Sequence, residues 1–241
     1  ARAAGAAVID RTPPAVAPVG AIDVIADAGG ATEIGPARAT LAHPRAGHTA
    51  TRLGDDVGAP VLIVGGLDPG GAPVAETELW KPLAGDLADP LAFVRPMVVP
   101  RAGHLARLMP DGSVLIIGGV DGGGAPVRTL ERYTIDAGFV AVGDLPATAG
   151  VIDLTATPLP DGRILLVGGR ATVGGPPVDT AAIARLDVID GSVDVVATDR
   201  LAVARAGHQA ALLCDGTVLV TGGTDGATRA ERYNPPAIGR R

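Results

Sequence analysis

A short apolar run closed by two glycines recurs along this chain at a nearly constant spacing, and this periodicity limits the possible folds more than any other pattern. Four copies are present, VLIVGG, VLIIGG, ILLVGG and VLVTGG, ending at Gly66, Gly119, Gly169 and Gly223. Successive copies lie 53, 50 and 54 residues apart. A fixed period of this size is typical of repeat proteins, in which each unit packs only against its neighbours.

Further motifs keep the same order around each run. An Asp-Gly pair stands before three of the runs, at Asp111, Asp161 and Asp215, and supplies the positive φ of a tight turn between two antiparallel strands. The tetrapeptide RAGH stands earlier in three repeats, beginning at Arg45, Arg101 and Arg205. After the glycines, a third strand carries an aromatic residue, at Trp80, Tyr133 and Tyr233. No segment shows a sustained helical period, so no helix of consequence is expected.

This order of motifs resembles the kelch repeat, and the LPDGRILLVGG wording from Leu159 to Gly169 is similar to its bacterial branch. The resemblance implies an all-β fold, a β-propeller of four-stranded blades around a central channel. We expect a single domain over residues 1–241. Its repeats span about residues 40–90, 91–144, 145–199 and 200–236, with 1–39 as a partial or closing blade.

The two ends of the chain and the third repeat depart from the family pattern. The segments Ala21–Ala26 and Ala31–Ile34 read as the third and fourth strands of an incomplete blade, and the last repeat stops near Pro235. We therefore expect the termini to meet and form a partial fifth blade; the alternative is a fragment of a larger propeller. The third repeat has Val151–Leu154 in place of RAGH, and the usual fourth-strand tryptophan is missing throughout.

Composition narrows the range of partners. Hydrophobic residues make up 47% of the chain and charged residues 19%, so a sizeable core is expected. The net charge of −6 disfavours nucleic acid as a partner, and no apolar run approaches the roughly 18 residues of a membrane span. The single cysteine, Cys214, does not decide the redox compartment, and an extracellular or periplasmic location is the working expectation.

Histidines and tyrosines could suggest a metal centre, and the pattern argues against one. His48, His104 and His208 each occupy the same position in a different repeat, so rotation about the axis should separate them, and hydrogen bonding between strands or blades is expected instead. Galactose oxidase has a related propeller that holds copper through tyrosines, histidines and a cysteine cross-link. Here both tyrosines belong to the repeat pattern and Cys214 lies in a turn, so no metal, cofactor or catalytic residue is predicted.

Residues at equivalent repeat positions are brought to one end of a propeller, so a candidate ligand site is expected at the channel mouth. Some ligand-binding kelch propellers use the RAGH arginine and the positions just after the glycine pair. The corresponding residues of this chain are Arg45, Arg101, Arg205, Asp68, Asp121, Arg170 and Asp225. The alternative for each arginine is an ion pair with an aspartate of a neighbouring blade.

Two functions from different classes follow. The first is a non-enzymatic binding module or scaffold that recognises a protein, peptide or glycan, with protein or peptide favoured because the chain has few aromatic residues for sugar stacking. The second is a kelch-type sugar mutarotase or epimerase, which needs only a few carboxylates, arginines or histidines in the channel. A bound ligand or ion in the channel would separate them.

Overall fold

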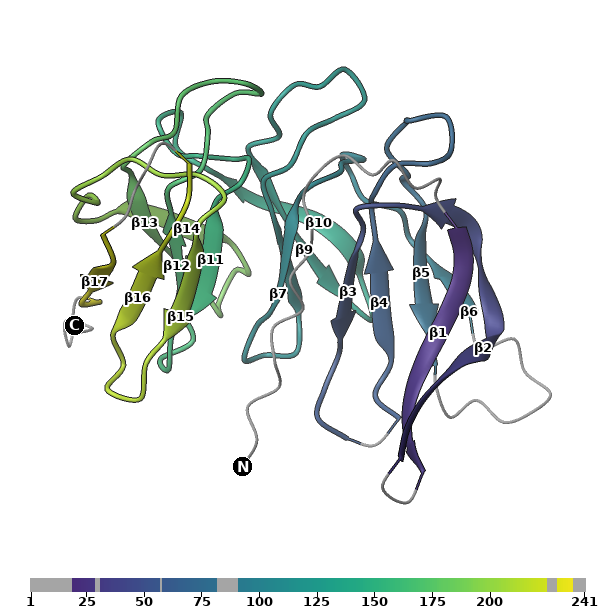
Figure 1. Ribbon diagram of the computed structural model, residues 1–241. Coiled ribbons are helices and arrows are strands. Elements are labelled where there is room, and N and C mark those ends of the chain that lie inside the picture. Colours follow the sequence, from purple (N-terminus) through teal and green to yellow (C-terminus); the bar gives the residue numbers. More distant parts are fainter. Residues whose placement is uncertain (1–18, 29–30, 57, 82–90, 225–228, 236–241) are drawn as a thin grey trace.

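The fold is an all-β propeller in which successive antiparallel sheets follow one another around an axis (Figure 1). The structure is a computed structural model, and it describes residues 19–28, 31–56, 58–81, 91–224 and 229–235. Within these residues no helix is present, as the sequence predicted. Each blade begins with an inner strand, and these inner strands contact one another in the order β3, β7, β11 and β15.

The first and second blades each contain four strands in sequence order. The strands of the first blade are β3 (Thr49–Arg52), β4 (Val61–Val64), β5 (Thr77–Trp80) and β6 (Leu91–Val94). Those of the second blade are β7 (Leu105–Leu108), β8 (Val114–Ile117), β9 (Thr129–Thr134) and β10 (Gly138–Asp144). Since β6 lies in the first sheet, the first blade runs to Val94 rather than to residue 90.

The third blade also has four strands, and the fourth blade has three. The strands of the third blade are β11 (Thr155–Pro158), β12 (Ile164–Val167), β13 (Ala181–Leu186) and β14 (Val193–Ala197). Those of the fourth blade are β15 (Gln209–Leu212), β16 (Val218–Thr221) and β17 (Glu231–Tyr233). The four glycine-pair runs therefore form the second strand of each blade, which confirms the predicted equivalence of the repeats.

The aromatic residues of the third strand occupy matching register positions. Trp80 lies opposite Val61, Tyr133 opposite Val114, and Tyr233 opposite Val218, which is the first residue of the second strand in each case. Tyr133 is 1% exposed and packs against Phe139 with ring centroids 5.0 Å apart. Tyr233 instead forms a hydrogen bond to the hydroxyl of Thr198 in the preceding blade.

Blades stack through apolar clusters that alternate along each second strand. Leu115 and Ile117 of β8 pack toward the third blade, whereas Val114 and Ile116 pack toward the first. Because strand residues alternate between the two faces of a sheet, a second strand with both faces covered is apolar throughout. All four residues of β8 have exposed fractions of 0%.

An N-terminal hairpin forms a separate two-stranded sheet. Strands β1 (Val19–Ala28) and β2 (Ala31–Arg45) pair with each other in a two-stranded antiparallel sheet. The predicted strands at 21–26 and 31–34 lie within them. Figure 1 shows this hairpin beside the first blade, at the opposite end of the molecule from β17. Within the described residues it joins no other sheet, so closure of the ring by the two termini stays a prediction.

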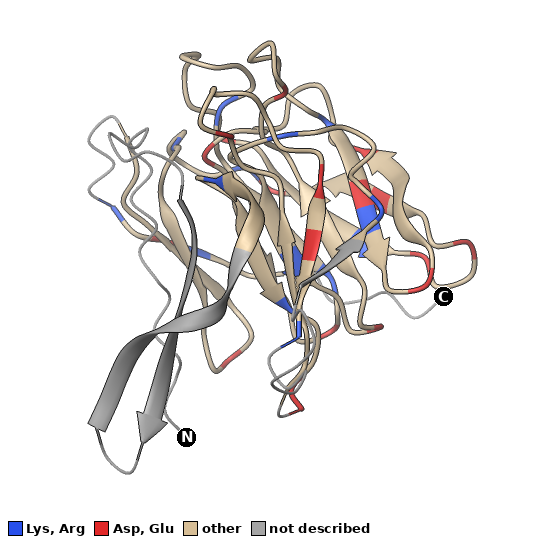
Figure 2. Ribbon diagram, turned by 90° about the vertical axis from the view of Figure 1, so that its right-hand side faces the viewer, with Lys and Arg blue, Asp and Glu red and all other residues tan. Residues whose placement is uncertain are grey.

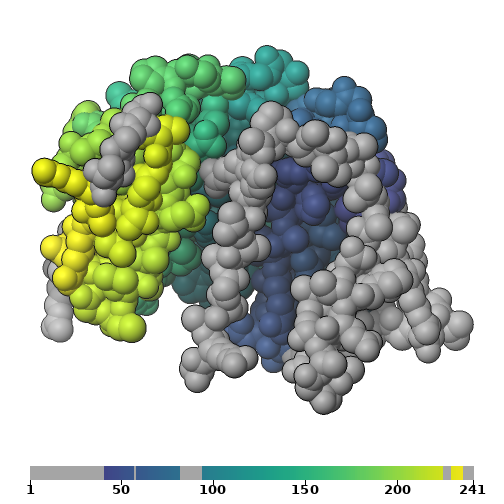
Figure 3. All heavy atoms as spheres, in the orientation of Figure 1, coloured from purple at the N-terminus to yellow at the C-terminus, as the bar shows by residue number. Residues whose placement is uncertain are grey.

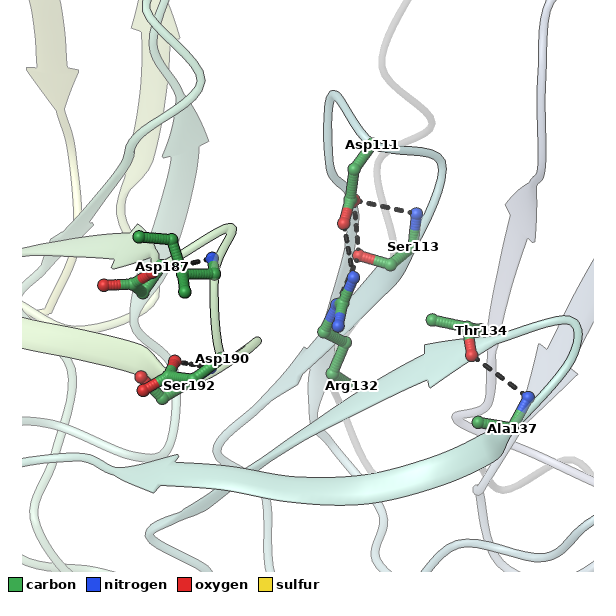
Figure 4. A network of polar contacts seen from close by, with 9 residues as sticks. Asp111, Ser113, Arg132, Thr134, Ala137, Asp187, Asp190 and Ser192 are labelled. Carbon is green, nitrogen blue, oxygen red and sulfur yellow. Dashed lines mark hydrogen bonds and ion pairs between the residues drawn. The ribbon is translucent and has the colours of Figure 1, made fainter.

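The hairpin turns at the opposite end from the glycine pairs are fastened by side chains. In the second blade, Asp111 accepts hydrogen bonds from the amide and hydroxyl of Ser113 and pairs with Arg132 of β9 (Figure 4). Asp215 binds Thr217 and Arg232 in the same way in the fourth blade. An aspartate in a tight turn satisfies nearby backbone amides, so the Asp-Gly pair shapes this end of the blades.

Candidate functional site

A buried arginine precedes the inner strand of the second blade. Arg101 is 0% exposed, and its guanidinium forms an ion pair with Glu131 of β9. The same side chain donates hydrogen bonds to the carbonyl oxygens of Val99, Gly118 and Thr129. We call this arrangement the Arg–Glu clasp, because it fastens the segment before β7 to the second and third strands of the same blade.

Glu131 completes the clasp by accepting hydrogen bonds from the backbone. Its carboxylate oxygens accept from the amides of Val98 at 2.7 Å and Val99 at 3.0 Å. Such extra hydrogen bonds matter because removing two charges from water costs on the order of several kcal/mol per ion. Burial lowers the pKa of Arg101, while the adjacent Glu131 carboxylate acts in the opposite direction. The clasp therefore fixes the chain where it enters the blade.

The clasp recurs in the first and fourth blades. Arg45 lies 2.7 Å from Glu78, and both side chains are 0% exposed. Arg205 lies 2.6 Å from Glu231, with exposed fractions of 0% and 19%. The sequence led us to expect Arg45, Arg101 and Arg205 at the channel mouth. A fully enclosed guanidinium cannot contact a ligand. The three arginines therefore lie in the interior of the blades and not at the channel mouth.

The third blade lacks the clasp altogether. Val151 stands where the other blades carry arginine, and Ala182 stands opposite Leu166, in the register position that carries glutamate elsewhere. Both replacements are buried and apolar. The two charges are therefore absent together, and neither partner is left unpaired in the interior.

Histidines join neighbouring blades, as the sequence predicted. His104 Nε2 lies 2.8 Å from the hydroxyl of Thr49, and His208 Nε2 lies 2.9 Å from that of Thr155. Between the second and third blades, Leu154 takes the histidine position and packs near Leu105. Burial, together with the positive charge of Arg101 and nearby His48, lowers the pKa of His104 to about 3. His104 is therefore a neutral structural residue at physiological pH.

The mouth is formed by the loops that follow the first three glycine pairs, between β4 and β5, between β8 and β9, and between β12 and β13, which lie at the top of Figure 1. Short bridges place Ala46, Ala102 and Ile152 each beside the first residue of such a loop, as between Ala102 and Val120. Asp68 accepts hydrogen bonds from two amides of its own loop at 2.8 and 2.9 Å, and Asp121 does the same at 2.9 and 2.9 Å. These aspartates hold their loops in shape and keep a second carboxylate oxygen at the rim.

Among the predicted arginines, Arg170 is the one that reaches the mouth. Its guanidinium donates to the carbonyl oxygen of Gly175 in its own loop and, at 3.3 Å, to the hydroxyl of Thr224 in the next blade. Its Nε also lies 4.0 Å from a carboxylate oxygen of Asp153, with side chains 20% and 35% exposed. A positive and a negative group thus stand together at the junction of the third and fourth blades.

Asp153 has an unusual backbone. Its φ is +55°, and among the described residues it is the one non-glycine with a positive φ. The other blades carry glycine here, at Gly47, Gly103 and Gly207, and a Cβ added to any of these would meet no atom within 4 Å. The Asp153 side chain takes the corresponding position in the third blade and is 35% exposed. Non-glycine residues in this conformation carry strain and concentrate at functional sites.

Several of these residues were missed by sequence reasoning. The sequence did not predict the glutamates that pair with the RAGH arginines. In the sequence each is only one of the residues just before the third-strand aromatic, although each follows its arginine by a similar interval: Glu78, Glu131 and Glu231. Asp153 had a clearer signal, since it replaces a glycine shared by the three other repeats. Asp225, which was predicted to lie at the mouth, falls outside the described residues.

Charge at this end is mixed, and no metal ligand set is apparent. Figure 2 shows basic and acidic positions interspersed over the strands and loops. Within the described ranges, no three His, Cys, Asp or Glu side chains gather closely enough to hold a metal ion. In the same part of the chain, no helix is long and apolar enough to cross a membrane.

Comparisons with known proteins agree with the architecture. A family model described as a domain of unknown function (DUF5122) beta-propeller matches residues 159–195. The solved structure of YjhT is similar with a TM-score of 0.66 and 14% identity, over 85% of this chain and 66% of that one. The present chain therefore spans less than two thirds of that protein's length.

No curated protein sequence matches the chain. A second solved structure is more distant. It is a fungal alcohol oxidase of the AA5 family in complex with copper, with a TM-score of 0.45 and 15% identity over 80% of this chain and 52% of that one. The repeats, the four stacked sheets and the similarity to YjhT together show that the chain folds as a β-propeller, with repeats that resemble the kelch repeat.

Proposed function

We propose that this protein is a non-enzymatic binding module that recognises a peptide segment of a partner protein at the channel mouth. The site is centred on Asp153 and Arg170, with Asp68 and Asp121 at its rim. The Arg205 segment of the fourth blade lies next to the site, because its carbonyl oxygen accepts a hydrogen bond at 2.8 Å from the amide of Gly169, the neighbour of Arg170. The observation that carries the proposal is Asp153, a non-glycine residue with a positive φ whose 35% exposed carboxylate lies 4.0 Å from the Arg170 guanidinium.

The pair at the mouth supplies both kinds of hydrogen-bonding group. The Asp153 carboxylate accepts hydrogen bonds and the Arg170 guanidinium donates them, so together they match the alternating amide and carbonyl groups of a peptide backbone. The two groups lie 4.0 Å apart, so one ligand can contact both of them side by side. Anchored loops keep both groups in place before binding, which reduces the entropy lost on association.

A peptide fits this site better than a glycan. Sugar sites commonly use an exposed aromatic ring as a platform, and the described aromatic side chains lie elsewhere. Trp80, Tyr133 and Tyr233 are on the third strands of their blades, and Phe139 is 8% exposed beside Tyr133. The mouth offers charged and amide groups instead.

Selection from a displayed random peptide library on the immobilised protein tests the proposal. Calorimetry on the selected peptides should show Kd rising about tenfold or more for Arg170→Gln and for Asp153→Asn. Asparagine tolerates a positive φ, so the second variant removes charge without changing the backbone. Asp190→Asn and Arg232→Gln, at turns of the opposite end, are matched controls and should bind like the parent. Unchanged affinity in both mouth variants would show that the site lies elsewhere.

The alternative activity, sugar mutarotation or epimerisation, is tested with the same variants. A carboxylate beside a guanidinium can hold and move a proton on a sugar hydroxyl, which is the observation that favours this second candidate. Anomer exchange of glucuronic acid, followed by NMR, should proceed at the uncatalysed rate when the protein is present. An acceleration that Asp153→Asn abolishes would replace the binding module with an enzyme.

A further inference from the structure

The third blade has a small hollow at the place of the missing Arg–Glu clasp. Its volume is about 230 Å³, the part open to solvent included. Ala182 lines the hollow and takes the register position of Glu131. In the second blade, Arg101 donates to three carbonyl oxygens, and the third-blade counterparts of those residues all line the hollow: Ala149, Gly168 and Thr180. The shorter side chains of the third blade therefore leave part of the space of the clasp empty.

The walls of the hollow are apolar. Leu145, Leu154 and Leu166 line it, and all three are buried. Among the described residues no charged side chain lines it, so a guanidinium or carboxylate that entered would lose its water without gaining a partner. The enclosed part has room for a group about the size of a methyl. The hollow therefore suits a small apolar group.

A glycine fixes the shape of the hollow. A Cβ added to Gly150 would lie 2.1 Å from the carbonyl oxygen of Gly168, and both glycines line the hollow. The other blades have larger residues at the position of Gly150, namely Pro44, Pro100 and Ala204. Because glycine alone permits this approach of two backbone segments, the hollow is specific to the third blade.

The hollow opens at the same end of the propeller as the channel mouth. Thr180 is the lining residue that is not buried, and it ends the loop that follows the third glycine pair. Its hydroxyl donates to the carbonyl oxygen of Thr148 at 3.4 Å, so the opening lies beside these two threonines. In Figure 3 this loop, drawn in green, lies at the top of the molecule beside the teal loop of the second blade.

The hollow adjoins the charged pair of the proposed site. Leu154, which lines the hollow, directly follows Asp153 in the sequence. Arg128 of the second blade connects the two places through its guanidinium. It donates at 3.2 Å to the carbonyl oxygen of Ala149, at the wall of the hollow, and at 3.4 Å to that of the residue after Arg170. One ligand can therefore contact the pair and enter the hollow.

We propose that this hollow receives a small aliphatic side chain of the peptide that the mouth binds, so that the site selects alanine, valine or a residue of similar size at one position. The hollow extends the mouth site, so this role rests on the proposed function. Burial of an apolar group there is favourable. Since successive residues of a chain are about 3.8 Å apart, the selected position lies within about three residues of the one that contacts Asp153 and Arg170.

Calorimetry with the peptides selected by display tests the proposal, and a glycine scan of each peptide finds the aliphatic position. Glycine at that position should raise the Kd for the parent about fivefold or more. Ala182→Leu and Ala149→Val both fill the hollow. Each should weaken binding of the unchanged peptide about fivefold or more, and glycine in the peptide should then raise the Kd by less than about twofold. Ala137→Leu, at an exposed turn of the opposite end, is the size-matched control.

Thermal melts check that the variants are folded, and two filling variants are used so that the result does not depend on one of them. Peptides that need Arg170 but bind both filled variants like the parent would overturn the role of the hollow and leave the proposed function intact. Peptides that respond to the filled hollow but not to Arg170→Gln or Asp153→Asn would do the reverse. A selection that yields no binding peptide would overturn both.

Discussion

The second and third blades solve the same structural problem with opposite chemistry. In the second blade, Arg101 and Glu131 form a buried clasp at the start of the sheet. In the third blade, Val151 and Ala182 occupy those two positions and fill them with apolar atoms. The sheets are otherwise alike, with four strands in the same order.

The same exchange occurs where blades meet. His104 and Thr49 join the first two blades through a hydrogen bond, whereas Leu154 and Leu105 meet between the second and third. A buried polar group is stable only when its partner is present, and replacing both partners by apolar groups can be nearly neutral. In both places apolar residues stand at the positions of both polar partners, and never at one of them alone. The two residues of each polar pair are therefore present together or replaced together.

Breaking one clasp from a single side should have the largest effect. Glu131→Ala leaves the Arg101 charge enclosed without a partner, and we expect the free energy of unfolding to fall by about 3 to 5 kcal/mol. The double variant Arg101→Val with Glu131→Ala gives the second blade the residues that the third blade has at these two positions. We expect it to regain much of the lost free energy of unfolding. Urea denaturation of the three proteins measures both values. A double variant no more stable than the single one would show that the polar pair is not a replaceable unit.

Tyr133 provides the next largest effect, because the third blade has Ala184 at the same register position. Tyr133→Ala should cost about 3 kcal/mol or more through the cavity that it leaves. Its hydroxyl is buried and has no hydrogen-bond partner among the described residues, so Tyr133→Phe should be neutral or slightly stabilising. Tyr233→Phe, which removes a bond to Thr198, is the contrasting control. If Tyr133→Ala and the parent melted at the same temperature, Tyr133 would not be packed as described.

The His104–Thr49 contact between blades should make the free energy of unfolding depend on pH, whereas the Leu154–Leu105 contact should not. Because the pKa of His104 is lowered to about 3 in the folded protein, the unfolded chain binds a proton below its ordinary value of 6.5 and the folded protein does not. Stability should therefore fall as pH falls from 6.5 toward 3, by about 1.4 kcal/mol per pH unit from this group. Between pH 6.5 and 5, the double variant Thr49→Leu with His104→Leu should lose that part of the slope. An unchanged slope would show that His104 is protonated in the folded state.

The smallest predicted effect concerns the backbone of Asp153. Asp153→Gly gives the third blade the glycine of the other blades and relieves a non-glycine positive φ. We expect a gain of up to about 1 kcal/mol, reduced by the greater freedom of glycine in the unfolded chain. Gly103→Asp is the reverse change in the second blade and should be destabilising by a similar amount. Calorimetry measures the melting temperatures of the two variants. If both temperatures shifted in the same direction from that of the parent, this account would be wrong.

The fold could be predicted from the sequence because its signals are periodic and local. Glycine pairs, Asp-Gly turns and aromatic positions recur in order, and each has a direct backbone reason. The site was harder to predict, because burial depends on partners distant in the sequence. Arg101 looks like a surface residue until Glu131 is placed against it, and Arg170 was the one predicted arginine that has no such glutamate. Asp153 could have been found from its glycine counterparts.

The spacing of the clasps also bears on how the chain acquires its structure during synthesis. Glu131 lies 30 residues after Arg101, so a clasp closes within one repeat, whereas His104 reaches back 55 residues to the blade already made. A ribosome adds about 5 to 20 residues per second, so one repeat emerges in about 3 to 10 seconds, far longer than local strand pairing requires. Each blade can thus close on its own and then dock onto a finished neighbour, and the nascent chain exposes only one unfinished interface at a time.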